Sequence, residues 1–492
     1  MKKSAIFPSL QLQEGPLNEQ VYSVIRHLII ERTLKVGSKL PSSRDLSTMM
    51  AVSRNTIIQG IERLIDEGYL ETKRGSGTYV TAKIPDKLIA QSMMITPQST
   101  TTTAPKISHA IQALQPHWAQ YHQHRLPGSI FRVGIGCTDL FPQKTWSRIL
   151  GRVARNAPKE IRSYNDVMGY LPLREVLASY LATTRGVHTT PEQIMIVNGT
   201  QQAINLTCQV LLNPHDEVIL DDPGYDGALC VFKNHQASIN LLHSDDEGMD
   251  IPYAKQHYPN TQLIYTAPSH QFPLGEMMSL TRRLQLLEWA KSHDKWIFED
   301  DYNGEFRYHS RAIQALQGLD QAERVIYSGT FSKMFYPGFR LGFIVLPKAL
   351  IEPFKIAKFY ADAGNTFLEQ AVLAAFIQEG EYAKHVRRVR KACLERQQAL
   401  IQALTQYLPE IFTITPLDSG IHSIAWINDA EDFPPLLAAC KALQLGAQPL
   451  DRYAVNPLVK KALIFGFAAH SPAIIRENIQ ALSQTYNTIS RH

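Results

Sequence analysis

The sequence lacks several features that mark membrane, secreted and metal-stabilised proteins. No apolar run reaches the eighteen or so residues that a membrane-spanning helix needs. Two lysines near the start are followed by no sustained apolar stretch, so we expect no secretory leader and a cytoplasmic location. The five cysteines are scattered, and no two of them have the spacing of a redox motif or a metal site. We therefore expect reduced thiols, no metal centre and no membrane partner.

The chain has only a modest excess of positive charge. Its net charge is +5, and residues 1–80 carry eleven Lys and Arg against eight Asp and Glu. Many enzymes are as basic as this, so charge alone does not indicate a nucleic-acid partner. A DNA-binding role has to rest on where the basic residues are placed.

Three stretches of different pattern follow one another in the 492 residues, which are too many for one ordinary core. Residues 14–81 combine helical apolar periods with a short strand-like end. Residues 82–128 lack sustained periodicity, which is typical of a linker, and hold one short helix around 107–121. Residues 129–492 alternate strand-like runs, such as Gln193–Val197 and Arg324–Ser328, with helical segments. This alternation predicts an α/β domain with a mostly parallel sheet.

The first stretch has the pattern of a helix-turn-helix. A helix over 16–31 precedes a second one that begins near Pro41, with Ser42 or Ser43 as its N-cap, and a third one capped by Ser53. The N-terminal residues of such a third helix meet base edges in the major groove. The alternative is a small docking domain with a solvated charged face. The residues predicted to read bases are Arg54, Asn55 and Thr56.

Residues 70–80 predict two strands around a basic glycine tip, from which Lys73 and Arg74 point towards phosphates or the minor groove. With the preceding helices, this stretch resembles the winged helix of the GntR family of bacterial regulators. The matching motifs are Leu40-Pro-Ser-Ser-Arg44, Val52-Ser-Arg-Asn-Thr56 and Gly75-Ser-Gly-Thr78. The resemblance implies a partner in double-stranded DNA, contacted by Arg44, Arg54, Asn55, Thr56, Arg74 and Gly75.

Several residues of the third stretch suit pyridoxal 5′-phosphate (PLP). Lys333 ends the run Tyr327-Ser-Gly-Thr-Phe-Ser-Lys333 and can supply the amine for a Schiff base, with burial and nearby cations lowering its pKa. Asp300 can pair with the pyridine nitrogen, Tyr302 can hydrogen-bond the ring oxygen, and Tyr225 can stack on the ring.

The PLP phosphate needs a cradle, and two regions of the sequence can supply one. Asn198-Gly-Thr-Gln201 follows a strand and opens a helix, so its backbone N–H groups suit an anion. An arginine further along adds charge-assisted N–H donors, next to two hydroxyl side chains. The candidate phosphate ligands are Gly199, Thr200, Gln201, Thr330, Ser332 and Arg340.

Each of these motifs has an ordinary explanation when taken singly. Most lysines in a Ser-x-Lys run are solvated, adjacent acids often end a strand, and Pro-Gly-Tyr usually forms a turn. The joint order of cradle, ring stacker, acid, lysine and arginine is what indicates a cofactor site. Asp300 and Asp301 both remain candidates for the nitrogen partner, and we favour Asp300.

This order resembles the fold-type I aminotransferases over nearly all of residues 129–492, with further matches at Tyr164-x4-Gly169-Tyr-x-Pro-Leu-Arg174 and Ala267-Pro-Ser-His-Gln-Phe-Pro-Leu-Gly275. With the GntR-like head, it resembles the MocR/GabR subfamily of PLP-dependent regulators. The resemblance implies a winged helix-turn-helix joined to an aminotransferase-like domain, itself a large α/β part and a smaller C-terminal α+β part. It also implies a PLP internal aldimine on Lys333 and a head-to-tail homodimer that reads a repeated DNA site.

Two positions depart from the subfamily pattern. Ala469 stands where the GABA-responsive regulator has the arginine that binds the ligand carboxylate, and Gly227 replaces a second arginine. Arg452 or His470 could substitute. An unpaired carboxylate in a partly buried site is costly, so we predict that GABA is not the ligand and that an amine without a carboxylate, or PLP itself, fits better.

Three functions compete on these residues. The first is a transcription regulator that senses an amine, an amino compound or PLP through Lys333, in which case vitamin B6 metabolism is one setting for it. The second is an active PLP-dependent aminotransferase with an appended DNA-binding domain, which the missing arginines argue against. The third is a regulator whose enzyme-like domain no longer binds PLP. We favour the first, without full transaminase turnover.

Overall fold

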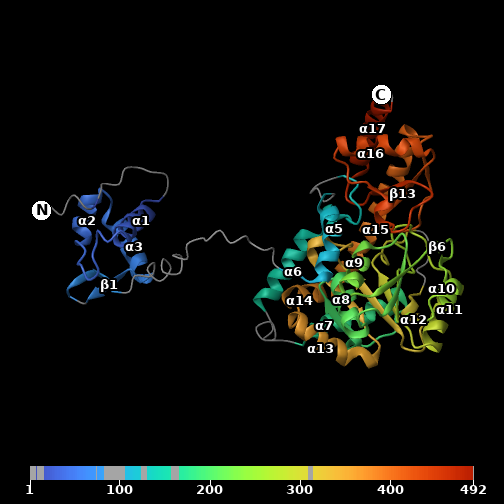
Figure 1. The fold of residues 1–492 in the computed structure, drawn as a ribbon, viewed down its shortest axis with the longest axis horizontal. Coiled ribbons are helices and arrows are strands. Elements are labelled where there is room, and N and C mark those ends of the chain that lie inside the picture. Colours follow the sequence, from blue (N-terminus) through green and yellow to red (C-terminus); the bar gives the residue numbers. More distant parts are fainter. Residues whose placement is uncertain are drawn as a thin grey trace. The chain divides into compact units, whose positions relative to one another are not determined.

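The chain forms two compact units, Met1–Lys106 and Ile107–His492 (Figure 1). The computed structural model describes residue 7 and residues 16–73, 75–82, 106–123, 130–156, 166–308 and 314–490. The predictions for Arg74 and Tyr164 therefore lie outside the described residues, as do the first residues of the predicted DNA-binding domain and most of the predicted linker.

The first unit consists of three helices and a hairpin. Helices α1 (Leu17–Ile30), α2 (Ser43–Met50) and α3 (Arg54–Asp66) precede strands β1 (Leu70–Lys73) and β2 (Gly77–Val80), which pair antiparallel. Apolar residues at helical spacing meet in one core, which includes Val21, Ile25, Leu46, Ile57 and Leu64.

The two helices of the predicted helix-turn-helix begin at serine caps. Ser42 Oγ accepts a hydrogen bond from Asp45 N at the start of α2, and Ser53 Oγ accepts one from Thr56 N at the start of α3, both at 3.2 Å. Of the two serines predicted for the first cap, Ser42 therefore caps the helix. Alanine 51 ends α2 in the left-handed conformation, with φ of 56°, and so begins the tight turn into α3.

The second unit is built on a seven-stranded sheet of order β3-β11-β10-β9-β8-β4-β5. All neighbours pair parallel except β11, which is antiparallel to both β3 and β10. The prediction of a mostly parallel sheet is confirmed. Its strands are β3 (Ile194–Val197), β4 (Glu217–Asp221), β5 (Ser238–Leu242), β8 (Leu263–Thr266), β9 (Trp296–Asp301), β10 (Val325–Thr330) and β11 (Gly342–Val345).

Apolar side chains cover both faces of this sheet. In β4, Val218 and Leu220 join the core that includes Ile204 of α8, while Ile219 between them joins the core that includes Leu286 of α11. Such runs of buried residues are typical of parallel strands covered by helices on both faces. The helices described in this unit are α5 (His109–Gln123), α6 (Gln143–Arg155), α7 (Leu171–Arg185), α8 (Thr200–Leu211), α9 (Asp226–Asn234), α10 (Ile251–His257), α11 (Leu280–Ser292), α12 (Leu316–Leu319), α13 (Ile351–Asp362), α14 (Leu368–Gln378), α15 (Glu381–Tyr407), α16 (Phe433–Ala442) and α17 (Pro472–Ile489).

The C-terminal part of the unit, orange to red in Figure 1, has its own four-stranded sheet of order β12-β13-β15-β14. Its strands are β12 (Phe412–Ile414), β13 (His422–Ile427), β14 (Gln448–Pro449) and β15 (Ala462–Gly466), all paired antiparallel. Helices α15, α16 and α17 pack together beside it. This is the smaller α+β part that the sequence predicts.

Two further elements complete the second unit. Strands β6 (Ser244–Asp245) and β7 (Gly248–Met249) form a small hairpin, and α5 is the helix predicted within the linker, which packs against α9. Within the described ranges, no helix is both long and apolar enough to cross a membrane.

Candidate functional site

A cavity of about 320 Å³ lies where the carboxyl ends of several strands of the large sheet meet. Because β3, β4, β9 and β10 point the same way, the loops that follow them come together at one edge of the sheet. All ten residues predicted from sequence to bind the cofactor line this cavity: Gly199, Thr200, Gln201, Tyr225, Asp300, Tyr302, Thr330, Ser332, Lys333 and Arg340.

Lys333 follows β10 and is held against the segment that precedes α6. Its Nζ donates a hydrogen bond to the Gly134 carbonyl oxygen at 2.9 Å. A Cβ at Gly136 would lie 2.0 Å from the Lys333 carbonyl oxygen, so only glycine allows this approach. Burial lowers the pKa of the Lys333 amine, the neighbouring Asp300 opposes that shift, and the Arg340 charge adds to it. A lowered pKa increases the fraction of the uncharged amine, which is the form that can act as a nucleophile.

Asp300 lies near the end of β9 with its carboxylate at the cavity. One oxygen, Oδ2, accepts a hydrogen bond from the Tyr265 hydroxyl at 2.7 Å, and the other, Oδ1, is buried without a partner. Burial raises the pKa of this carboxyl to about 7, and the Tyr265 hydrogen bond partly offsets the rise. The site thus presents one unpaired carboxylate oxygen to a ligand.

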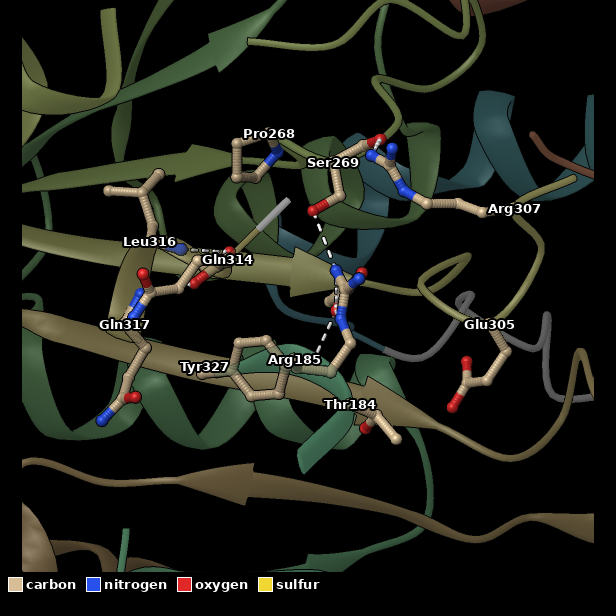
Figure 2. Close-up of polar contacts among 12 residues, drawn as sticks. Thr184, Arg185, Pro268, Ser269, Glu305, Arg307, Gln314, Leu316, Gln317 and Tyr327 are labelled. Atoms are coloured by element: carbon tan, nitrogen blue, oxygen red, sulfur yellow. Dashed lines mark hydrogen bonds and ion pairs between the residues drawn. The ribbon is translucent and has the colours of Figure 1, made fainter. Parts of the chain in front are cut away.

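Asp301 is the next residue of β9, and its side chain takes the opposite face, as alternation along a strand requires. Its Oδ2 accepts hydrogen bonds from Arg185 Nε and from the Tyr327 hydroxyl, each at 2.6 Å. Figure 2 shows the Arg185 guanidinium between Tyr327 and Ser269, whose Oγ accepts a further hydrogen bond at 3.0 Å. Asp301 is therefore the partner of a buried arginine, and it does not line the cavity.

The predicted phosphate cradle is formed by the start of α8 and by Arg340. Gly199, with φ of 101°, precedes the helix, whose first N–H groups have no partner within the helix. A Cβ at Gly199 would lie 3.4 Å from the Arg340 guanidinium, which donates to the Asn198 carbonyl oxygen. Ser332 Oγ is buried and has no hydrogen-bond partner among the described residues. Positive charge, helix N-terminus and hydroxyl thus meet on one side of the cavity.

Two tyrosines form further parts of the cavity wall. Tyr225 precedes α9 and accepts a hydrogen bond on its hydroxyl oxygen from Gln201 Nε2 at 2.9 Å. Gly227 leaves room for the Tyr225 ring, because a Cβ there would lie 2.4 Å from Tyr225 Cζ. The Tyr302 hydroxyl is buried without a hydrogen-bond partner among the described residues.

These groups fit PLP. Three buried polar atoms in the cavity wall lack partners, namely Asp300 Oδ1, Tyr302 OH and Ser332 Oγ, and buried polar groups normally have one. They stand beside a buried amine with a lowered pKa and beside the N-terminus of α8, where an anion is favoured. A planar cofactor with an aldehyde, a pyridine nitrogen, a ring oxygen and a phosphate matches this set of groups.

Several cavity residues were missed by sequence reasoning. Of the two candidates for a substitute arginine, Arg452 lines the cavity, whereas neither His470 nor Ala469 does. Tyr265 lies inside a strand whose apolar run hides its role, and the others come from other strands and from loops, where no local pattern marks them. The residues missed include Arg132, Tyr265, Phe272, His422, Gln448 and Tyr453.

The predicted DNA-reading residues lie at the exposed N-terminal end of α3. Arg54 and Asn55 are exposed and Thr56 is partly so. Arg54 Nε donates to Ser43 Oγ at 3.1 Å, which holds the guanidinium near the start of α2. Arg44 is exposed on α2.

On the hairpin, the Lys73 Nζ lies 5.1 Å from the centre of the Tyr79 ring and 3.4 Å from a Glu71 oxygen. Gly75, at the tip, has φ of 74° and open space around it. Both residues are exposed, as contact with a nucleic-acid backbone requires.

Comparison with known proteins covers both units. Residues 17–80 match the bacterial regulatory proteins of the gntR family, and residues 134–480 match the aminotransferases of class I and II. The chain is 34% identical over 474 residues, 96% of this chain and 94% of the relative, to the probable rhizopine catabolism regulatory protein MocR of Rhizobium meliloti. It is 26% identical over 457 residues, 93% of each chain, to the pyridoxine biosynthesis transcriptional regulator PdxR of Corynebacterium glutamicum.

The second unit also matches solved enzymes. The kynurenine aminotransferase of Pyrococcus horikoshii, solved in complex with PMP, aligns with a TM-score of 0.68 and 27% identity, over 82% of this chain and 99% of the enzyme. A winged helix joined to an aminotransferase-like domain defines a class of bacterial transcription regulators. The chain belongs to the MocR subfamily of the GntR family within that class. The predicted resemblance and fold class are confirmed.

Proposed function

We propose that this regulator binds PLP through Lys333 and uses the occupied cavity to sense an amine, an amino compound or PLP itself. The observation that carries the proposal is the meeting of the ten predicted residues around one cavity with three unpartnered polar atoms. The names of two similar proteins support the cofactor, since one regulates pyridoxine biosynthesis and the other is an aminotransferase solved with PMP.

Each cofactor group has a proposed partner in the chain. PLP supplies an aldehyde that condenses with amines and a ring that withdraws electrons from the bonded carbon. Lys333 Nζ is the amine of the chain, and burial favours its uncharged form. Asp300 holds a proton at the ring nitrogen and is itself oriented by the Tyr265 hydroxyl. Tyr302 donates to the ring oxygen, and Tyr225 covers the ring face.

We propose that the phosphate lies at the start of α8. Gly199, Thr200 and Gln201 contribute N–H groups there, since a helix N-terminus favours an anion. The Arg340 side chain supplies the balancing charge. The hydroxyls that complete the cradle are those of Thr330 and Ser332.

The proposed output is a change in DNA binding. Arg54, Asn55 and Thr56 read bases from the start of α3, and Arg44, Lys73, Arg74 and Gly75 contact the backbone or the minor groove. We propose a head-to-tail homodimer whose two winged helices read a repeated site, with residues 14–81 as the DNA-binding domain, 82–128 as the linker and 129–492 as the effector domain. Ligand state can change DNA affinity only if it favours one arrangement of these parts over another.

A titration of the full-length protein tests the proposal. Adding PLP should produce the visible absorbance of a lysine-bound cofactor, and adding the effector should change both that absorbance and the affinity for DNA upstream of the gene. Lys333→Ala should lose the absorbance and the response but still bind DNA, whereas Lys348→Ala, which removes an exposed lysine, should behave as wild type. A normal effector response in Lys333→Ala would contradict the proposal.

The complete set of cofactor residues also suits an active aminotransferase. The position of Lys333 at the cavity is what proton transfer during transamination requires. Single-turnover measurements on a panel of amines separate the two functions. Turnover at the rate of metabolic aminotransferases would favour the enzyme, and binding without turnover favours the regulator.

A further inference from the structure

Two arginines besides Arg340 line the cavity, and neither is needed for the proposed cofactor contacts. Arg132 comes from the segment before α6, and Arg452 comes from the turn after β14. The loss of arginine at 227 and 469 led us to expect a ligand without a carboxylate. The positions of Arg132 and Arg452 change that expectation.

Arg132 lies against the segment that departs from the subfamily pattern. The Gly466 N–H donates to the Phe131 carbonyl oxygen at 2.9 Å, and a Cβ at Gly466 would lie 2.1 Å from the Arg132 carbonyl oxygen. The backbone of Arg132 thus packs against Gly466, the last residue of β15, and Ala469 follows three residues after Gly466. Among the described residues, no hydrogen-bond acceptor or carboxylate pairs with its guanidinium.

Arg452 is held in place with N–H donors to spare. Its Nη1 donates to Gln448 Oε1 at 2.7 Å, and the Gln448 amide in turn donates to the Gly446 carbonyl oxygen. The nearest carboxylate oxygen, on Asp226, is 4.0 Å from Nη2. The side chain is 13% exposed, and a guanidinium has five N–H donors, so a mostly buried cation is left incompletely satisfied.

The two usual positions cannot serve in this chain. At 227, a Cβ would lie 2.2 Å from Gln201 Nε2 and 2.4 Å from Tyr225 Cζ, so no larger side chain fits while Tyr225 keeps its place. Ala469 does not line the cavity. The cavity instead has cationic groups on Arg132, some 340 residues before Ala469, and on Arg452, in the turn after β14.

We infer that Arg132 and Arg452 form a subsite for an anionic group on the effector, such as a carboxylate or a sulfonate. The inference rests on the proposed function, in which Arg340 and the start of α8 take the cofactor phosphate. Arg132 and Arg452 then bring two positive charges to the cavity. The negative charge of Asp226 offsets one of them, so one positive charge remains in excess. The effector class that fits is therefore an amine that carries one acidic group, and alkylamines without an acidic group fit poorly.

Matched ligands test this inference on the full-length protein loaded with PLP. The series pairs short alkylamines with amino carboxylates and aminosulfonates of the same length, and the change in visible absorbance gives each Kd. The amines with an acidic group should bind about tenfold tighter or more, as expected for a charged hydrogen bond. The carboxylate and sulfonate arms show which acid the subsite prefers.

Three variants locate the preference. Arg132→Gln and Arg452→Gln should each lose about tenfold of affinity for the acidic amines while keeping that for alkylamines. Arg476→Gln, which removes an exposed arginine on α17, should change neither. Arg→Lys changes at the same two positions keep the charge and should lose less.

Two outcomes overturn the inference. The first is equal affinity of wild type for alkylamines and for amines with an acidic group. The second is a preference for the acidic amines that survives in the Arg132→Gln, Arg452→Gln double variant. The absorbance of bound PLP separates this failure from that of the proposed function. If wild type acquires that absorbance but shows no acidic preference, only the anion subsite is wrong. If it never acquires the absorbance, both proposals fall.

Discussion

At the residue scale, Asp300 and Asp301 are adjacent in sequence and differ in every neighbour. Asp300 faces the cavity with one free oxygen, and Asp301 faces Arg185 in a buried ion pair. A carboxylate whose pKa is raised to about 7 by burial is poorly stabilised until a cation arrives. Asp301 already has its cation, Arg185. Loss of the charge on Asp301 should therefore lower the stability of the fold, whereas loss of the charge on Asp300 should not.

We expect Asp301→Asn to destabilise the second unit strongly and Asp300→Asn to leave its stability nearly unchanged. Loss of Asp301 leaves the Arg185 charge buried without a counter-ion, at a cost of about 3–5 kcal/mol. Urea unfolding followed by tryptophan fluorescence measures both changes, since all five tryptophans lie after residue 106. Asp300→Asn should instead weaken PLP retention. A stable Asp301→Asn protein would contradict this account of the pair.

His385 on α15 predicts a dependence of stability on pH. Its Nε2 lies 2.9 Å from the Met334 carbonyl oxygen and its Nδ1 lies 3.0 Å from Arg388 Nη2, so the neutral ring donates to one and accepts from the other. Burial lowers its pKa to about 4, with the Arg388 charge adding to the shift. In the unfolded chain the ring takes up a proton near pH 6.5.

The pKa of His385 is lower in the folded protein than in the unfolded chain. Its contribution to the free energy of unfolding therefore decreases as pH falls from about 7 towards 4. Between pH 7 and pH 5 the wild type should lose about 2 kcal/mol relative to His385→Gln. Urea unfolding of both proteins across this range gives the difference directly. If the difference in unfolding free energy between the two proteins stays constant across this range, the pKa of His385 is alike in the folded and unfolded states.

At the element scale, α9 joins the cavity to α5. Tyr225, its N-cap, and Asp226, its first residue, line the cavity, and α5 packs on the same helix. Between these helices, His117 Nε2 lies 3.1 Å from Lys233 Nζ. The helix that borders the cavity therefore also contacts α5.

We predict that Gly227→Ala impairs PLP binding although alanine is the better helix former. The added Cβ would lie within 2.5 Å of the Tyr225 ring and of Gln201, so Tyr225 must leave the cavity wall. Gly151→Ala on α6 is the control, because its Cβ meets only the flexible end of Arg155 at 3.4 Å. There the usual gain of about 1 kcal/mol in helix stability should appear, with PLP affinity unchanged. Titration by visible absorbance compares the two variants.

At the scale of the whole molecule, the winged helix and the proposed cofactor cavity belong to separate compact units. We expect Arg54→Ala to weaken binding to specific DNA by about 1–3 kcal/mol if the side chain reads a base. PLP binding should stay as in wild type, because the variant changes only the first unit. Measured affinities for specific and random DNA decide the role. An equal loss on both would assign Arg54 to phosphate contact instead.

The sequence by itself determined the fold class and indicated ten residues that lie around one cavity. Helical and strand periods, caps such as Ser53, and the order of motifs from Gly199 to Arg340 are local, and parallel strands bring their carboxyl ends to one edge. Local patterns therefore sufficed to place ten residues around one cavity.

Only the tertiary structure decided which other groups meet there. Asp300 is distinguished from Asp301 by Tyr265 and Arg185, which lie on other elements. Arg132 reaches the cavity because glycines at 446 and 466 let its backbone approach closely, about 200 residues before Lys333. Such contacts depend on how elements pack, and no period or spacing along the chain encodes them.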